Sequence, residues 1–202
     1  MEATEFLQFL HRIETLKTNA RHCMTAGGVP ESVAAHSWRM AVMAMLLRDE
    51  FPALDMEKVT RMCLIHDFGE AVTGDIPSFV KTAGNEKDEQ IALAGLIGTL
   101  PAPQREELTA LFAEMDALET QEARLYKTLD KLEAVIQHNE SDISTWIERE
   151  YTLNLTYGEE NAAQFPFLAA VRAEMKRDTE QKIRDAYAGG VCAGPRDGEK
   201  TE

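Results

Sequence analysis

The sequence predicts an all-α fold built as a single domain. Apolar residues recur three and four positions apart along almost the whole chain, which is the spacing of one face of an α-helix. We find no segment in which apolar and polar residues alternate convincingly, as they do in a half-buried β-strand. The chain has 202 residues, 44% of them hydrophobic, which is enough to form one domain with its own core.

Three predicted helices occupy the first third of the chain, at residues 4–17, 33–49 and 56–69. Ser32 and Asp55 precede the second and third helices and are residue types that cap helix N-termini. A Gly-Gly-Val-Pro segment at 27–30 and Phe51-Pro52 separate the helices. We therefore expect a loop, not a strand, between residues 18 and 31.

The second part of the chain continues the helical pattern. The predicted helices cover residues 86–100, 104–119, 120–139 and 161–188. The two in the middle could also form one bent helix, and Phe165-Pro166 could mark the start of the last one. We expect residues 1–188 to form the folded domain and the small, polar, Gly-rich residues 189–202 to form a disordered tail.

Charge and composition exclude several classes of function. The net charge is −14, from 21 basic and 35 acidic side chains, so most of the surface should repel nucleic acids. A small anion held by a metal ion and one or two cations is still compatible with this charge. We see no apolar stretch of membrane-helix length and no secretory signal, and the three cysteines form no CxxC pair. These features predict a cytoplasmic protein that acts on neither membranes nor nucleic acids.

Two of the five histidines, His36 and His66, fall on apolar helix faces, and Asp67 follows His66 directly. Imidazole and carboxylate groups together are ligands for divalent metals, and a second histidine with a further carboxylate would complete a site open to water. For His36 taken alone, a buried, hydrogen-bonded core histidine is the more common explanation. Spacing does not choose the further carboxylate among Asp116, Asp130 and Glu133.

The wider pattern is more specific than any one of these residues. His36 follows Glu31-Ser32-Val33, His66-Asp67 begins a string that continues to Glu70 and Gly74-Asp75-Ile76-Pro77, and Asp130 comes 63 positions after Asp67. This order resembles the HD-domain phosphohydrolases, and within them the small 5′-deoxynucleotidases. The resemblance covers about residues 6–139. It implies a helical bundle with the active site between helices.

The resemblance also implies roles for individual residues. His36, His66, Asp67 and Asp130 match the metal ligands of the family. Glu70 and Asp75 match the acids that handle water and proton transfer; Arg21, and less clearly Lys81, match cations that face the substrate phosphate. The implied cofactor is one divalent ion (manganese, cobalt, zinc, iron or magnesium), with manganese and cobalt to be tested first. Relatives are often homodimers, which implies the same for this chain.

The expected activity is hydrolysis of a (deoxy)nucleoside 5′-monophosphate by a metal-activated water molecule. Two enzymatic alternatives are hydrolysis of a triphosphate or alarmone nucleotide, which needs more basic residues, and a two-metal site, which needs more histidines. Two non-catalytic alternatives are a metal- or nucleotide-binding module and a purely structural helical adaptor.

One position departs from the family pattern. In similar bacterial members of the family a tryptophan follows the phosphate-binding arginine and packs near the sugar, whereas His22 stands there in this chain. The resemblance therefore does not fix the preference between deoxyribose and ribose. From the sequence alone we expect His22 and His138 to be ordinary surface residues.

Overall fold

The all-α prediction is confirmed. The computed structural model describes residues 1–189, which are mostly helical, and Gly189 is the only residue of the predicted tail among them. The rest of that tail prediction falls outside the described residues. The helices are α1 (Ala3–Ile13), α2 (Val33–Leu46), α3 (Met56–Ile65), α4 (Glu70–Thr73), α5 (Ala83–Ile97), α6 (Ala102–Ala117), α7 (Gln121–Glu140), α8 (Glu150–Thr156), α9 (Glu159–Ala162) and α10 (Pro166–Ala188).

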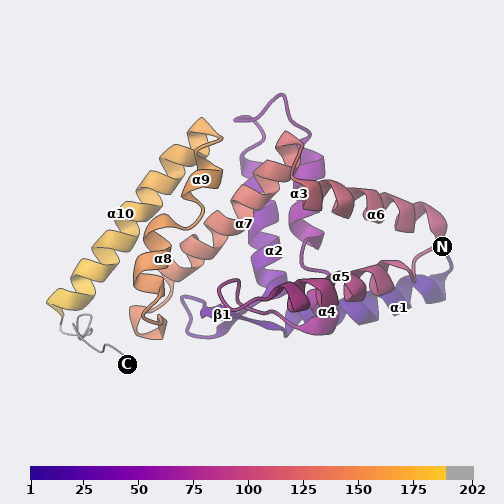
Figure 1. Ribbon diagram of the computed structural model, residues 1–202, viewed down its shortest axis with the longest axis horizontal. Coiled ribbons are helices and arrows are strands. Elements are labelled where there is room, and N and C mark those ends of the chain that lie inside the picture. The colour runs from indigo at the N-terminus through magenta and orange to yellow at the C-terminus, as the bar shows by residue number, and fades with distance from the viewer. Residues whose placement is uncertain (190–202) are drawn as a thin grey trace.

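Helices α2, α3 and α7 pack together in the middle of the molecule and contribute most of the buried apolar core (Figure 1). Both predicted caps are confirmed. The hydroxyl of Ser32 accepts a hydrogen bond from the Ala35 amide at 3.1 Å, and the Asp55 carboxylate accepts one from the Lys58 amide at 2.9 Å. These caps fix where α2 and α3 begin, and so which of their residues face α7.

A second group of helices, α8 to α10, covers the other side of α7 (Figure 1). The sequence did not predict α8, which is short and irregular in its apolar spacing. Gly158 follows it with a φ of 77°, and a Cβ atom there would lie 3.1 Å from the Cβ of Lys131 on α7. Glycine therefore permits both the turn and the close contact with α7.

The expectation of a loop between residues 18 and 31 is wrong. Two short antiparallel strands, β1 (Ala20–Met24) and β2 (Pro30–Ser32), form a hairpin there. The strands have only five and three residues, which is too short to show a clear alternation of apolar and polar residues. Their pairing register is also irregular. Gly28, with a φ of 77°, lies in the turn between them.

Several helix boundaries differ from the predicted ones. The first helix ends at Ile13 and continues as a 3₁₀ helix over Glu14–Lys17, and α5 starts at Ala83 after the cap Thr82. Helices α6 and α7 are separate, because Leu118 adopts left-handed backbone angles between them. The last helix starts at Pro166, the alternative start.

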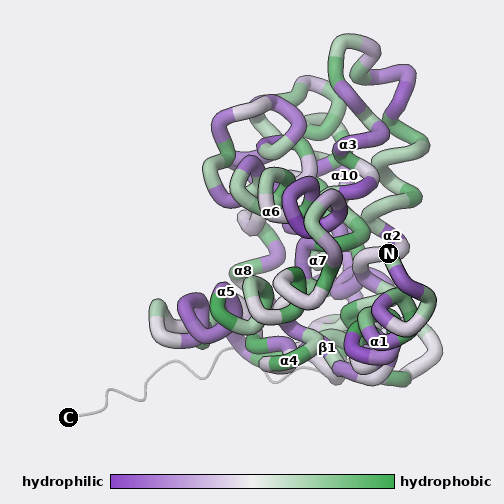
Figure 2. Tube along the Cα trace, turned by 90° about the vertical axis from the view of Figure 1, so that its right-hand side faces the viewer, coloured by the Kyte–Doolittle hydropathy of each residue, from purple (hydrophilic) through white to green (hydrophobic). Residues whose placement is uncertain are grey.

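Along the helices of residues 1–189, hydrophobic and hydrophilic residues succeed one another within each turn (Figure 2). This pattern is expected of amphipathic helices that bury one face and expose the other. The apolar face of α1 is an exception to full burial, since Phe6 and Leu7 are each 51% exposed. Among residues 1–189, no helix has both the length and the apolar character needed to cross a bilayer.

Candidate metal centre and its pocket

The four predicted metal ligands come from three separate segments that meet in the core. His36 lies in the first turns of α2 and Asp130 in the middle of α7. Helix α3 ends at Ile65, four residues before the end at Gly69 that the sequence predicts, so His66 and Asp67 lie in the tight turns before α4. This early end directs both side chains toward α2 and α7.

The structure brings these four side chains within a few ångströms of one another. Nε2 of His36 lies 3.3 Å from Oδ1 of Asp130, and Nε2 of His66 lies 3.9 Å from the same oxygen. Oδ2 of Asp67 is 2.9 Å from Nε2 of His66. One nitrogen each of His36 and His66 and one oxygen of Asp67 all fit within 4.8 Å of each other.

Each imidazole is held in orientation by a partner of its Nδ1 atom, on the side of the ring away from the other ligands. Nδ1 of His36 contacts the buried carboxylate of Glu133, and Nδ1 of His66 is 3.0 Å from the carbonyl oxygen of Cys63. A proton on each Nδ1 would leave Nε2 free to bind a metal. Nε2 of His66 is buried and lies close to the carboxylates of Asp67 and Asp130, but it forms no hydrogen bond among the described residues. This donor set therefore fits a divalent cation.

The charges of the cluster are strongly coupled. Burial opposes ionisation of Asp130, but Lys127, whose Nζ is 2.7 Å away, and the two imidazoles hold the pKa of Asp130 well below its usual range. Burial and Arg21 disfavour a charged His36, yet its contacts with Asp130 and Glu133 raise the pKa of His36 to about 9. The cluster thus attracts positive charge to its centre.

Glu70 and Asp75 lie on the next segment of chain, α4 and the loop after it. Glu70 is buried beside Asp67, and its Oε2 has no hydrogen-bond partner among residues 1–189. Burial, together with Asp67 and Asp75, raises the pKa of Glu70 to about 10, and burial also raises the pKa of Asp75. Both carboxyl groups line the same pocket as Asp67 and Asp130. Such groups can exchange protons with a bound ligand.

The two predicted cations also line this pocket. Arg21, on β1, has NH1 3.7 Å from Oδ2 of Asp67 and Nε 3.2 Å from Glu31. The ammonium group of Lys81 pairs with Glu89 of α5. Arg21 is therefore placed directly beside the cluster, whereas the charge of Lys81 is shared with a carboxylate.

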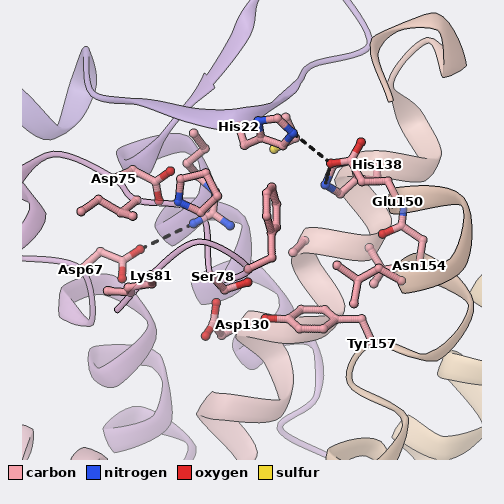
Figure 3. Close-up of a pocket in the computed structure, with 18 of the residues that line it drawn as sticks. His22, Asp67, Asp75, Ser78, Lys81, Asp130, His138, Glu150, Asn154 and Tyr157 are labelled. Atoms are coloured by element: carbon pink, nitrogen blue, oxygen red, sulfur yellow. Dashed lines mark ion pairs between the residues drawn. The ribbon is translucent and has the colours of Figure 1, made fainter. Parts of the chain in front are cut away.

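The pocket has a volume of about 340 Å³ and extends from the Asp–His cluster to α8. Figure 3 shows Asp67, Asp75 and Lys81 on one side of it and His138, Glu150 and Asn154 on the other. This volume lies in the range typical of small-molecule sites.

His22 is exposed, as expected, and His138 is half-buried, but neither is an ordinary surface residue. Both line the pocket, and their Nε2 atoms lie 3.2 and 3.4 Å from Oε1 of Glu150. His22 also packs edge-on against Phe79, with ring centroids 5.3 Å apart. No pattern in the sequence indicates these contacts, because they depend on the position of α8.

Sequence reasoning also missed the groups that hold His36 in place. Glu133 is completely buried, and Arg39 donates a hydrogen bond from Nε to its Oε1 at 2.6 Å. Arg39 further bonds Glu140 and Gln137. The positions 130 and 133 on α7 and 36 and 39 on α2 are each three apart, which is the one signal that could have linked them.

Two imidazoles and two aspartates that meet at one end of a pocket, with two further acids and an arginine beside them, define the class of metal-dependent hydrolases. The comparison with known proteins narrows this class. The HD domain family model matches residues 13–170, most of the chain. The chain belongs to this HD-domain family.

Individual relatives agree with this assignment. The chain is 35% identical over 142 residues to the 5′-deoxynucleotidase HDDC2 of Homo sapiens, covering 68% of this chain and 69% of the relative. It is 30% identical over 163 residues to the 5′-deoxynucleotidase hdd1 of Schizosaccharomyces pombe, covering 72% and 81%. A crystal structure of a predicted metal-dependent phosphohydrolase from Magnetospirillum magnetotacticum superposes with a TM-score of 0.76 at 28% identity, over 89% of this chain and 93% of that one.

Proposed function

We propose that this protein is a metal-dependent phosphomonoesterase that removes the 5′-phosphate from (deoxy)nucleoside monophosphates. The observation that carries the proposal is the convergence of His36, His66, Asp67 and Asp130 at one end of a pocket large enough for a nucleotide. The 5′-deoxynucleotidases among its relatives support the same activity.

In this proposal His36, His66, Asp67 and Asp130 hold one divalent cation. When bound, such a cation lowers the pKa of a water molecule and polarises a phosphoryl oxygen. Glu133 and the Cys63 carbonyl keep Nε2 of each imidazole turned toward the ligand position. An ion that takes more than four ligands would keep positions open for water and substrate beside these four side chains, whereas a four-coordinate ion would be closed.

Glu70 and Asp75 divide the proton transfers between them. An oxygen of Glu70 lies within 4.8 Å of one of Asp67, so we assign Glu70 to orient the attacking water. Burial and the neighbouring carboxylates raise the pKa of Glu70, and a bound cation would offset those carboxylates and favour the ionised form, which would accept the proton of that water. Asp75 lines the pocket farther along the chain, after the turn at Gly74, and we assign it to protonate the leaving 5′-oxygen.

Arg21 neutralises phosphate charge in this mechanism, and Lys81 assists. Arg21 is a partly buried guanidinium beside Asp67, and its planar donors suit phosphate oxygens. The other lysine of the described pocket lining, Lys127, already pairs with Asp130. So few available cations favour a monophosphate over a triphosphate or an alarmone nucleotide.

The metal is a transition ion in this proposal, with manganese and cobalt tested first, because two imidazoles and two carboxylates suit such ions. We propose a homodimer, which would cover apolar side chains such as Phe6 and Leu7 that α1 leaves exposed. We also propose a cytoplasmic location, consistent with the free, buried thiols of Cys23 and Cys63.

The test is phosphate release from a panel of ribo- and deoxyribonucleoside 5′-monophosphates, with manganese, cobalt, zinc, iron or magnesium added in turn. We expect turnover that depends on the metal and is lost in Asp67→Ala and Glu70→Ala. Wild-type protein that releases no phosphate from any member would overturn the function. Full activity in both variants would instead overturn the assigned mechanism.

A further inference from the structure

The end of the pocket far from the Asp–His cluster contains a buried amide group with no partner. Asn154, on α8, is only 2% exposed and lines the pocket. Its Nδ2 atom has no hydrogen-bond partner among the described residues. A buried NH₂ group without an acceptor costs free energy, so its presence beside a cavity indicates a ligand that supplies the acceptor.

The backbone around Asn154 is held rigidly. Arg172 of α10 donates from NH2 to the carbonyl oxygen of Asn154 and from Nε to that of Tyr157, each at 2.9 Å. Arg172 is itself buried, with 3% exposure. These bonds fix the C-terminal turn of α8 against α10, so the Asn154 side chain is presented to the pocket by a fixed support.

The neighbouring polar groups contact one another. Oε2 of Glu150 accepts a hydrogen bond from the Ile147 amide at 2.8 Å. Its Oε1 lies 3.2 and 3.4 Å from Nε2 of His22 and His138 but forms no hydrogen bond among the described residues. Figure 3 shows Glu150 and Asn154 together at this end, with His138 next to them. Glu150 Oε1 can only accept a hydrogen bond, whereas Asn154 Nδ2 is a buried donor without a partner among the described residues.

The remaining lining supplies apolar and aromatic walls. Phe79, Leu153, Val135, Ala134 and Tyr157 line the same pocket, and Phe79 packs against His22. Apolar and aromatic walls with a few convergent polar groups are the usual construction of a small-molecule site, and they suit a flat heteroaromatic ring.

We propose that Asn154 reads the nucleobase of the substrate, donating a hydrogen bond from Nδ2 to a ring nitrogen or carbonyl oxygen of the base. This inference rests on the proposed function, because the phosphate must lie at the Asp–His cluster for the base to reach α8. It assigns the α8 end of the pocket as a nucleobase subsite and Asn154 as a residue that determines specificity.

The experiment compares wild-type protein with Asn154→Ala on substrates with and without a base. The probes are the four common deoxynucleoside 5′-monophosphates and 2-deoxyribose 5-phosphate. We expect kcat/KM to fall about tenfold on the preferred nucleotide, the size of one lost hydrogen bond to a buried group, and to stay unchanged on the abasic sugar phosphate. Thr156→Ala, an exposed change on the same helix, is the matched control and should alter neither.

Direct binding separates this inference from the proposed function. The four deoxynucleosides, which lack the phosphate, are titrated calorimetrically into both proteins, and Asn154→Ala should weaken binding of the best one about tenfold. An unchanged affinity, or an equal loss of activity on the abasic substrate, would overturn the role of Asn154. If wild-type protein binds nucleosides through Asn154 yet cleaves no monophosphate, the subsite stands and the proposed reaction fails.

Discussion

The two ends of the pocket contain the same residue types, but their histidine nitrogen atoms have different partners. Each end holds a pair of histidines beside carboxylates: His36 and His66 with two aspartates, and His22 and His138 with Glu150. At the first end each imidazole has an outer partner on Nδ1, so Nε2 faces inward. At the second end one oxygen of a single carboxylate contacts both Nε2 atoms, and its other oxygen accepts a backbone hydrogen bond.

The difference shows what makes a histidine pair suitable for a metal. Proximity to carboxylates is common to both ends. The number of carboxylates and the partner of the second ring nitrogen differ, and these decide whether Nε2 lone pairs converge on open space. On this physical basis the Asp–His cluster is suited to bind a cation, and the Glu150 group is suited to fasten α8 to β1 and α7.

The largest expected effect comes from removing a carboxylate at the first end. Asp67→Ala or Asp130→Ala should lower phosphate release about a thousandfold, because the loss of a ligand removes several kcal/mol of stabilisation of the reaction. Elemental analysis of the purified variants should show that the bound metal is lost as well.

The matched controls are His22→Gln and His138→Gln, at the other end of the pocket. Both should keep the full metal content, with activity on 2-deoxyribose 5-phosphate within about threefold of wild type. If either control loses its metal, the two ends are one coupled site and the distinction between them is wrong.

A smaller effect is expected from the carboxylate behind His36. Glu133→Gln should weaken metal binding 10- to 100-fold, on the order found for outer partners of metal-bound histidines, measured by competition with a chelator. Saturating metal should restore the activity, which a merely misfolded variant would not show. Glu140→Gln, which removes an exposed partner of the same Arg39, should leave the affinity unchanged.

Most residues at the Asp–His end of the pocket could be predicted from the sequence. His36 and His66 fall on apolar faces, and the Ser32 and Asp55 caps set the phase of α2 and α3, so convergence on the core could be expected. Asp130 could not be chosen over Glu133 by spacing alone. Both side chains face His36, one toward Nε2 and the other toward Nδ1, because they lie three residues apart on α7.

The second end could not be predicted, for a different physical reason. Glu150 and Asn154 lie on a helix of seven residues, which is stabilised by tertiary contacts with α10 and α7 rather than by its own periodicity. The hairpin that contains Arg21 and His22 is likewise too short to be predicted from the alternation of apolar and polar residues. Residues whose placement depends on such elements are visible only in the structure.

The smallest of these expected effects is a loss of folding stability when Glu150, a buried residue of α8, is replaced. Glu150→Ala leaves the Ile147 amide and both imidazoles without their partner, and should lower the free energy of unfolding by about 2 kcal/mol in urea denaturation. Glu150→Gln keeps the acceptor for Ile147 and should lose less than half of that. Glu148→Ala, an exposed change just before α8, should stay within about 0.5 kcal/mol of wild type. Unchanged stability in Glu150→Ala would show that this group does not fasten α8, and a loss of bound metal would show that it belongs to the cation site after all.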